Sequence, residues 1–135
     1  MSSQKRNLGD VAARFVRKAH SDEIALDKLA DDPDVPDDLI GFHSQQALEK
    51  LLKAALAHAG VAPPRIHDLG ELLTLLGDAG LSPPVSVSDA RALVPWAVDF
   101  RYDDALEERL DRDAARVAVE KMREWVDDLL AEPKP

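Results

Sequence analysis

The chain has 135 residues, no cysteine and a net charge of −9 from 17 basic and 26 acidic residues. This length suits one domain with a single core, and the lack of cysteine excludes disulfides and thiolate chemistry. The polar N-terminus does not resemble a signal peptide, and charged residues interrupt every long apolar stretch, so no segment is expected to span a membrane. We expect a cytoplasmic single domain over residues 1–135, with its core at about 8–130 and a flexible tail at 131–135.

Apolar residues recur at steps of three and four along the chain, which predicts helices. The first is expected from Leu8 to Ala30, where the prolines of the next segment end it. The second is expected from Asp38 to His58, with Asp37 or Asp38 as its N-cap and Gly60 closing its C-terminus. The third is expected from His67 to Asp78 and stops at Gly77 or Gly80.

The C-terminal part of the chain predicts two more helices. Ser86 or Ser88 should cap a helix that runs toward Phe100 and is kinked or split at Pro95. The last helix is expected over residues 106–130. Its inward residues should be Leu110, Ala114, Val117, Met122, Trp125, Val126 and Leu129. The predicted fold is all-α, an up-and-down bundle of four main helices plus a short or kinked fifth.

Four polar residues of the second helix, His43, Gln46, Lys50 and Lys53, fall within a sector of ~80° at about 100° per residue. Such a row of donors could hold a phosphate or a nucleobase edge, and residues 41–70 escape the general negative charge with a net +1. A solvated face whose lysine stems cover apolar neighbours explains the same pattern.

Two further groups are candidate ligand contacts. Arg65 and His67 flank the start of the third helix, where free N–H groups favour an anion; alternatively His67 serves only a loop contact. Arg101 and Tyr102 precede two aspartates. An arginine beside two aspartates is more often locally salt-bridged than catalytic, and a core position with a satisfied hydroxyl explains Tyr102. No histidine pair has helical zinc spacing and no glycine-rich phosphate loop is present, so no metal or cofactor is expected.

The stretch from Phe42 to Ala54, FHSQQALEKLLKA, resembles the signature helix of the HEPN (higher eukaryotes and prokaryotes nucleotide-binding) domain. His67-Asp68-Leu69 and Arg101-Tyr102 also fall where that family has HDL and RY. The resemblance covers about residues 12–126. It implies a bundle of four or five helices that forms a homodimer, often paired with a minimal nucleotidyltransferase in a toxin–antitoxin-like system.

Several branches of that family are metal-independent ribonucleases with an Arg-x4-6-His pattern near the last helices. Counting from Arg101, the histidine should be at position 106, 107 or 108, which are Leu106, Glu107 and Glu108. Arg14 and His20 match the spacing, but in the first helix, where the family does not place its site. The sequence therefore departs from the ribonuclease branch.

Three hypotheses follow. The first is a nucleotide- or RNA-binding homodimer that uses the second-helix face together with Arg65, His67, Arg101 and Tyr102, and that acts with a nucleotidyltransferase. The second is a divergent metal-independent ribonuclease using Arg101 with His43 or His67 as general acid or base. The third is a helical protein-docking module without a ligand.

Overall fold

The structure, a computed structural model, describes residues 2–93 and 110–132, with side chains from residue 7 onward except that of Arg91. Described elements are α1 (Ser2–Leu29), α2 (Asp37–His58), α3 (Leu69–Asp78), α4 (Val87–Arg91) and α5 (Arg112–Ala131). Within these residues the fold is helical without strands, which confirms the all-α prediction. The expected kink at Pro95, the helix continuing to Phe100 and the start of the last helix at 106–109 lie outside the described residues.

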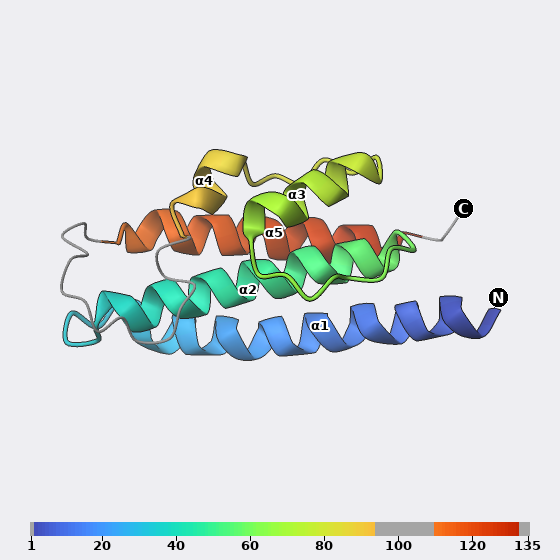
Figure 1. Cartoon of the computed structure of the whole chain (residues 1–135). Helices are drawn as coiled ribbons and strands as arrows, with labels where there is room; N and C mark the ends of the chain where they lie inside the picture. Colours follow the sequence, from blue (N-terminus) through green and yellow to red (C-terminus); the bar gives the residue numbers. More distant parts are fainter. Residues whose placement is uncertain (1, 94–109, 133–135) are drawn as a thin grey trace.

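The helix α2 lies at the centre of the bundle and packs against α1, α3 and α5, while α4 packs on α3. The helices α1 and α2 are antiparallel, whereas α5 runs in the same direction as α2 (Figure 1). The connection from residue 59 to 68 returns along α2 before α3 begins (Figure 1). Three long helices therefore form the framework, and the shorter α3 and α4 cover one side of it.

Most residues of α2 are buried, as expected for a helix enclosed by three neighbours. Ala47, Ala54 and Ala55 are fully buried, and their small side chains let the neighbouring helices approach closely. The leucines between these alanines belong to one core cluster with leucines of α3 and apolar residues of α5. Each of these leucines contributes about 1.5–3 kcal/mol when fully buried. The largest fully buried apolar side chains are Ile40, Leu48, Leu51, Leu52, Leu56, Leu69, Leu72, Leu76, Met122 and Val126.

Glycines close α2 and α3 in the same way. Gly60 and Gly80 have φ of +89° and +83°, a backbone conformation that residues with a Cβ rarely adopt. After α2, the N–H of Gly60 donates to the Ala57 carbonyl and that of Val61 to the Leu56 carbonyl. This pair of bonds is a Schellman motif. Gly60 therefore terminates α2 as predicted, and of the two glycines expected for α3 it is Gly80 that adopts the left-handed conformation.

The predicted N-cap of α2 is wrong. Pro36 occupies the N-cap position and makes no side-chain hydrogen bond. Asp37 lies inside the helix, where its carboxylate accepts from the Leu110 N–H at 3.2 Å and from Arg112 Nε at 2.8 Å. A long-range ion pair has thus taken the carboxylate that local capping would have used.

Arg112, the first residue of α5, fastens the connection between α1 and α2. Its Nη1 donates to the carbonyls of Ala30 at 3.1 Å and Asp32 at 2.9 Å, and its Nη2 donates to the Val35 carbonyl. These carbonyls follow the end of α1, where no helical N–H can reach them. One guanidinium thereby joins three elements.

Three other helix starts differ from the predictions. The helix α1 begins at Ser2, six residues before Leu8. The helix α3 begins at Leu69 because Asp68 is its N-cap and accepts from the Glu71 N–H, and α5 begins after Asp111, which caps Ala114 in the same way. Ala114 and Val117 are exposed, contrary to the prediction. The buried face of α5 is instead formed by Ala115, Ala118, Val119, Met122 and Val126, because these residues lie toward α2.

Candidate functional site

A buried carboxylate of α1 binds two polar residues of α2. Asp22 is 6% exposed and lies between Ala19 and Leu26 on the inner face of α1. Its Oδ2 accepts a hydrogen bond from Lys50 Nζ at 2.6 Å, and its Oδ1 lies 2.9 Å from His43 Nδ1. The imidazole and the ammonium, two helical turns apart on α2, therefore share one counterion.

Glu49 is the second buried carboxylate, with a side chain that is 6% exposed. Its Oε1 accepts from Gln45 Nε2 at 3.0 Å, and its Oε2 lies 3.2 Å from Lys53 Nζ and 3.0 Å from His67 Nδ1. Burial raises the pKa of Glu49, but the hydrogen bonds with His67, Gln45 and Lys53 and the attraction of the lysine charge outweigh it. The net effect lowers the pKa of Glu49 below its ordinary 4.5.

The segment before α3 is bound to α2 through the same network. Gln45 Nε2 also donates to the His67 carbonyl at 3.3 Å, and Gln46 Nε2 donates to Gln45 Oε1 at 2.7 Å. The His67 side chain is 73% exposed although its Nδ1 is engaged by Glu49. One edge of the imidazole is thus fixed while most of the ring faces solvent.

We call the polar residues of this part of α2 the α2 polar stripe. It comprises His43, Gln45, Gln46, Glu49, Lys50 and Lys53. Asp22 of α1 binds it on one side and His67 on the other. The four residues singled out from the sequence do lie together, and buried carboxylates or amides engage all of them.

The residues predicted to contact a ligand differ in how far their side chains are exposed to solvent. The side chains of His43 and Lys50 are 25% and 22% exposed, whereas that of Lys53 is only 7% exposed. Arg65 is exposed and makes no side-chain hydrogen bond or ion pair with the described part of the chain. Arg101 and Tyr102 lie outside the described residues. At the start of α3, the Asp68 carboxylate itself accepts from the Glu71 N–H at 3.1 Å, so it competes there with an external anion.

Asp22 and Glu49 were not singled out from the sequence as site residues, although they organise the site. Asp22 follows Ala19 by three residues and precedes Leu26 by four, so it has the phase of a buried position. A carboxylate at such a position requires a partner, because an unpaired buried charge is costly. That phase was the available signal for Asp22.

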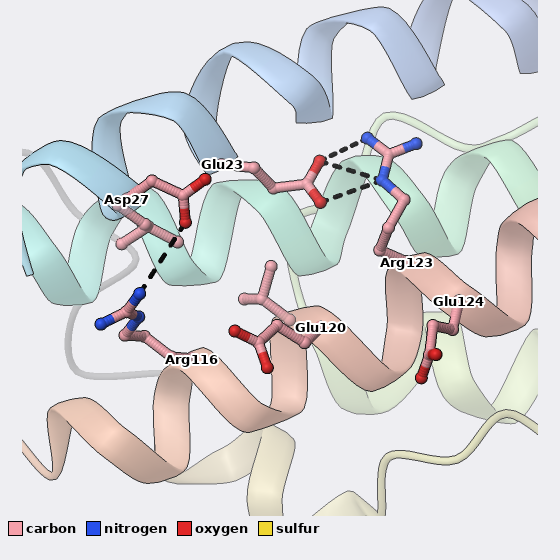
Figure 2. A pocket seen from close by; sticks show the side chains of 8 residues that line it. Glu23, Asp27, Arg116, Glu120, Arg123 and Glu124 are labelled. Carbon is pink, nitrogen blue, oxygen red and sulfur yellow. Dashed lines mark hydrogen bonds and ion pairs between the residues drawn. The ribbon is translucent and has the colours of Figure 1, made fainter.

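A separate hollow of about 440 Å³ lies between α1 and α5 (Figure 2). Arg123 of α5 reaches Glu23 of α1, and Arg116 reaches Asp27, so ion pairs bridge its two sides (Figure 2). The residues that line it are Glu23, Leu26, Asp27, Arg116, Val119, Glu120, Arg123 and Glu124. With four carboxylates against two guanidiniums, this hollow disfavours a phosphorylated ligand.

The helices within residues 2–93 and 110–132 include no apolar stretch of the length that a membrane span requires. Those residues also form no group of three or more histidine, aspartate and glutamate side chains that could hold a metal ion.

Comparison with known proteins identifies a family. The family model described as the HEPN domain matches residues 12–131, nearly the whole chain. No curated protein and no solved structure matches the chain at a significant level. The matched region contains the helical bundle, the α2 polar stripe and both of its buried counterions. The chain therefore belongs to the HEPN domain family.

Proposed function

We propose that this HEPN chain is a nucleotide- or RNA-binding module that works as a homodimer beside a minimal nucleotidyltransferase in a toxin–antitoxin-like pair. The observation that supports this most is the α2 polar stripe, in which the family's signature residues converge. The His43 imidazole and two ammonium groups lie along α2, the His67 imidazole lies beside them from the segment before α3, and the carboxylates of Asp22 and Glu49 order all four. Donors ordered before the ligand arrives lose less entropy on binding.

The charge balance of this region suits a phosphate. Lys50, Lys53 and Arg65 equal Asp22, Glu49 and Asp68 in number even when both imidazoles are neutral, so the region lacks the negative charge of the rest of the chain. Lys50 and Arg65 supply cationic donors that solvent reaches, whereas buried Lys53 contributes its charge from below. His43 and His67 add donors when protonated, and Gln46 retains amide atoms for a base edge.

Calorimetric titration with ATP, GTP and a short RNA tests this proposal. Arg65→Ala and Lys50→Ala should each weaken binding about tenfold, as expected for loss of a charged hydrogen bond worth roughly 1.5 kcal/mol. Lys121→Ala, at an exposed position of α5, is the matched control and should bind as the wild type does. Arg65→Ala removes an exposed side chain, so its effect is separable from any loss of folding in Lys50→Ala. Absence of heat with all three ligands would reject nucleotide and RNA binding.

A divergent metal-independent ribonuclease is the second candidate, and the His67–Glu49 pair favours it. A carboxylate on Nδ1 fixes the orientation of an imidazole whose exposed part can then exchange a proton with a substrate. RNA incubated with the protein in chelator decides this case. Cleavage that His67→Gln and Arg101→Ala both abolish would place the ribonuclease first, and intact RNA would remove it.

The pairing with a nucleotidyltransferase has its own test. A nucleotidyltransferase encoded next to this chain and co-expressed with it should co-elute in a stable complex on size-exclusion chromatography. Separate elution of the two proteins at micromolar concentration would reject the pairing while leaving ligand binding to the calorimetry.

A further inference from the structure

Positive charge is concentrated at the N-terminal end of a chain that is acidic elsewhere. Residues 1–20 contain five lysines and arginines against the single acid Asp10, a net charge of +4. The remaining 115 residues therefore carry −13. This asymmetry places a basic segment on the first two-thirds of α1, which begins at Ser2.

Three of these cations form one ridge on the surface of α1. Arg14, Arg17 and Lys18 are all exposed, and at about 100° per residue they fall within a sector of ~100°. None of the three makes an ion pair or a side-chain hydrogen bond with the described residues, unlike Arg112, Arg116 and Arg123, which are all paired. We call Arg14, Arg17 and Lys18 the α1 ridge.

The α1 ridge flanks the α2 polar stripe. Lys18 lies one helical turn before Asp22, the carboxylate that binds His43 and Lys50 of the stripe. Arg14 directly precedes Phe15, whose ring centroid is 6.0 Å from Lys53 Nζ at the other end of the stripe. The helices α1 and α2 are antiparallel (Figure 1). With Asp22 bound to Lys50 and Phe15 near Lys53, residues 14–18 lie beside the C-terminal half of the stripe.

We infer that the α1 ridge and the α2 polar stripe together bind a single strand of RNA rather than a mononucleotide; this rests on the proposed function above. From His43 to Lys53 the stripe extends over about 15 Å at 1.5 Å per residue, and the ridge widens it by a second row of cations. A mononucleotide carries its phosphates at one end, so it cannot use both rows. A strand with a phosphate on every residue can.

The charge on other faces favours the same placement of the strand. The outer side of α5 exposes Glu120, Glu124, Asp127 and Asp128, which repel a polyanion. An approaching strand is therefore directed away from α5 and toward α1 and the stripe. Proteins that bind single strands commonly have a cationic groove that follows the phosphate backbone, and unpaired bases offer their edges to hydrogen bonds.

The test compares a ridge variant, Arg14→Gln/Lys18→Gln, with a control that removes the same number of positive charges. The control, Lys28→Gln/Lys121→Gln, changes exposed lysines of α1 and α5 outside the ridge. Fluorescence anisotropy with an eight-nucleotide RNA and calorimetry with ATP are the two measurements. The ridge variant should bind the RNA about tenfold more weakly, and the slope of log K against log salt should fall by about 1.4, for two lost phosphate contacts on a single strand. ATP affinity should stay within twofold of the wild type.

The outcomes separate this inference from the proposal on which it rests. If the wild type binds both ligands and the ridge variant matches its control for RNA, the ridge inference is wrong and the nucleotide module stands. If the wild type binds neither ligand, the proposed function fails and the inference fails with it. A ridge variant that changes the mass in solution instead of the RNA affinity assigns the ridge to a second protein copy. A single-stranded DNA of the same length and base sequence, measured by the same anisotropy, would exclude RNA as the ligand if it bound more tightly than the RNA.

Discussion

Glu49 of α2 and His67, which lies just before α3, meet with Oε2 and Nδ1 3.0 Å apart, across 18 positions of sequence. The contact joins a residue that is almost fully buried to one that is mostly exposed. One carboxylate of the family signature therefore both stabilises the fold and positions a surface residue, because it neutralises buried Lys53 and also orients the exposed imidazole of His67.

Glu49→Gln should lower the free energy of unfolding by about 3 kcal/mol, because it leaves the Lys53 charge buried without its counterion. Glu124→Gln removes an exposed carboxylate of α5 and should change stability by less than about 0.5 kcal/mol. Urea unfolding followed by circular dichroism at neutral pH measures both. Equal stability of the two variants would show that the Glu49–Lys53 pair contributes nothing.

The same carboxylate predicts a dependence of stability on pH. Since the folded state lowers the pKa of Glu49 below 4.5, the unfolded state binds the proton more readily. The contribution of Glu49 is complete above pH 4.5 and is lost as the pH falls through its lower folded-state pKa. Unfolding curves recorded from pH 6 down to pH 3 should therefore be flatter for Glu49→Gln than for the wild type. Parallel curves would contradict the lowered pKa.

Arg112→Lys should destabilise the protein by about 2 kcal/mol although the charge is kept, because an ammonium cannot reproduce several directed hydrogen bonds at once. The guanidinium bonds the Asp37 carboxylate and carbonyls that follow α1. Lys121→Arg, the reverse exchange at an exposed position of α5, should have no measurable effect. Thermal unfolding checks this, and a wild-type melting temperature for Arg112→Lys would refute it.

The pair of Arg123 and Glu23 should stabilise the contact between α5 and α1. Their side chains are 19% and 16% exposed and make more than one hydrogen bond, and the bond to Glu23 raises the pKa of Arg123, so the arginine is always charged. A double-mutant cycle with Arg123→Met and Glu23→Gln should give a coupling of about 1–2 kcal/mol. The cycle for Arg116 and Asp31, whose carboxylate is 83% exposed, should give less than about 0.5 kcal/mol. Similar couplings would mean that burial does not set the strength of these pairs.

Gly80→Ala and Gly77→Ala, three residues apart, should change stability in opposite directions. Gly80 has a φ of +83°, so a Cβ there costs about 1 kcal/mol. Gly77 lies in the last turn of α3 with open space where the Cβ would be, and alanine is the better helix former by about 0.8–1.0 kcal/mol. Chemical denaturation of the two variants measures this, and destabilisation by both would contradict the assignment of Gly80 as the terminating residue.

The proposed homodimer should give twice the chain mass of 14.8 kDa by light scattering at micromolar concentration. A monomeric mass at that concentration would reject it. The measurement should be repeated on Arg14→Gln/Lys18→Gln, since the inference for the α1 ridge requires an unchanged mass.

The sequence by itself determined the helices and the family. Apolar steps of three and four residues, proline breaks and the glycines at 60 and 80 locate the described helix starts to within six residues, because these signals act through the local backbone. Capping was less predictable where a distant residue intervened. The local sequence around Asp37 predicts an N-cap, but the Asp37 carboxylate instead binds Arg112, 75 positions away in the sequence.

Only the tertiary structure decided what the polar residues of α2 face. Periodicity places His43, Gln46, Lys50 and Lys53 on one side of a helix, but it does not show which groups pair with them. The counterion Asp22 comes from α1, and Glu49 also binds His67 from the segment before α3. Whether a charged side chain is solvated or buried depends on which helix packs over it. That depends on free energies of packing and desolvation between distant segments, which local spacing does not contain.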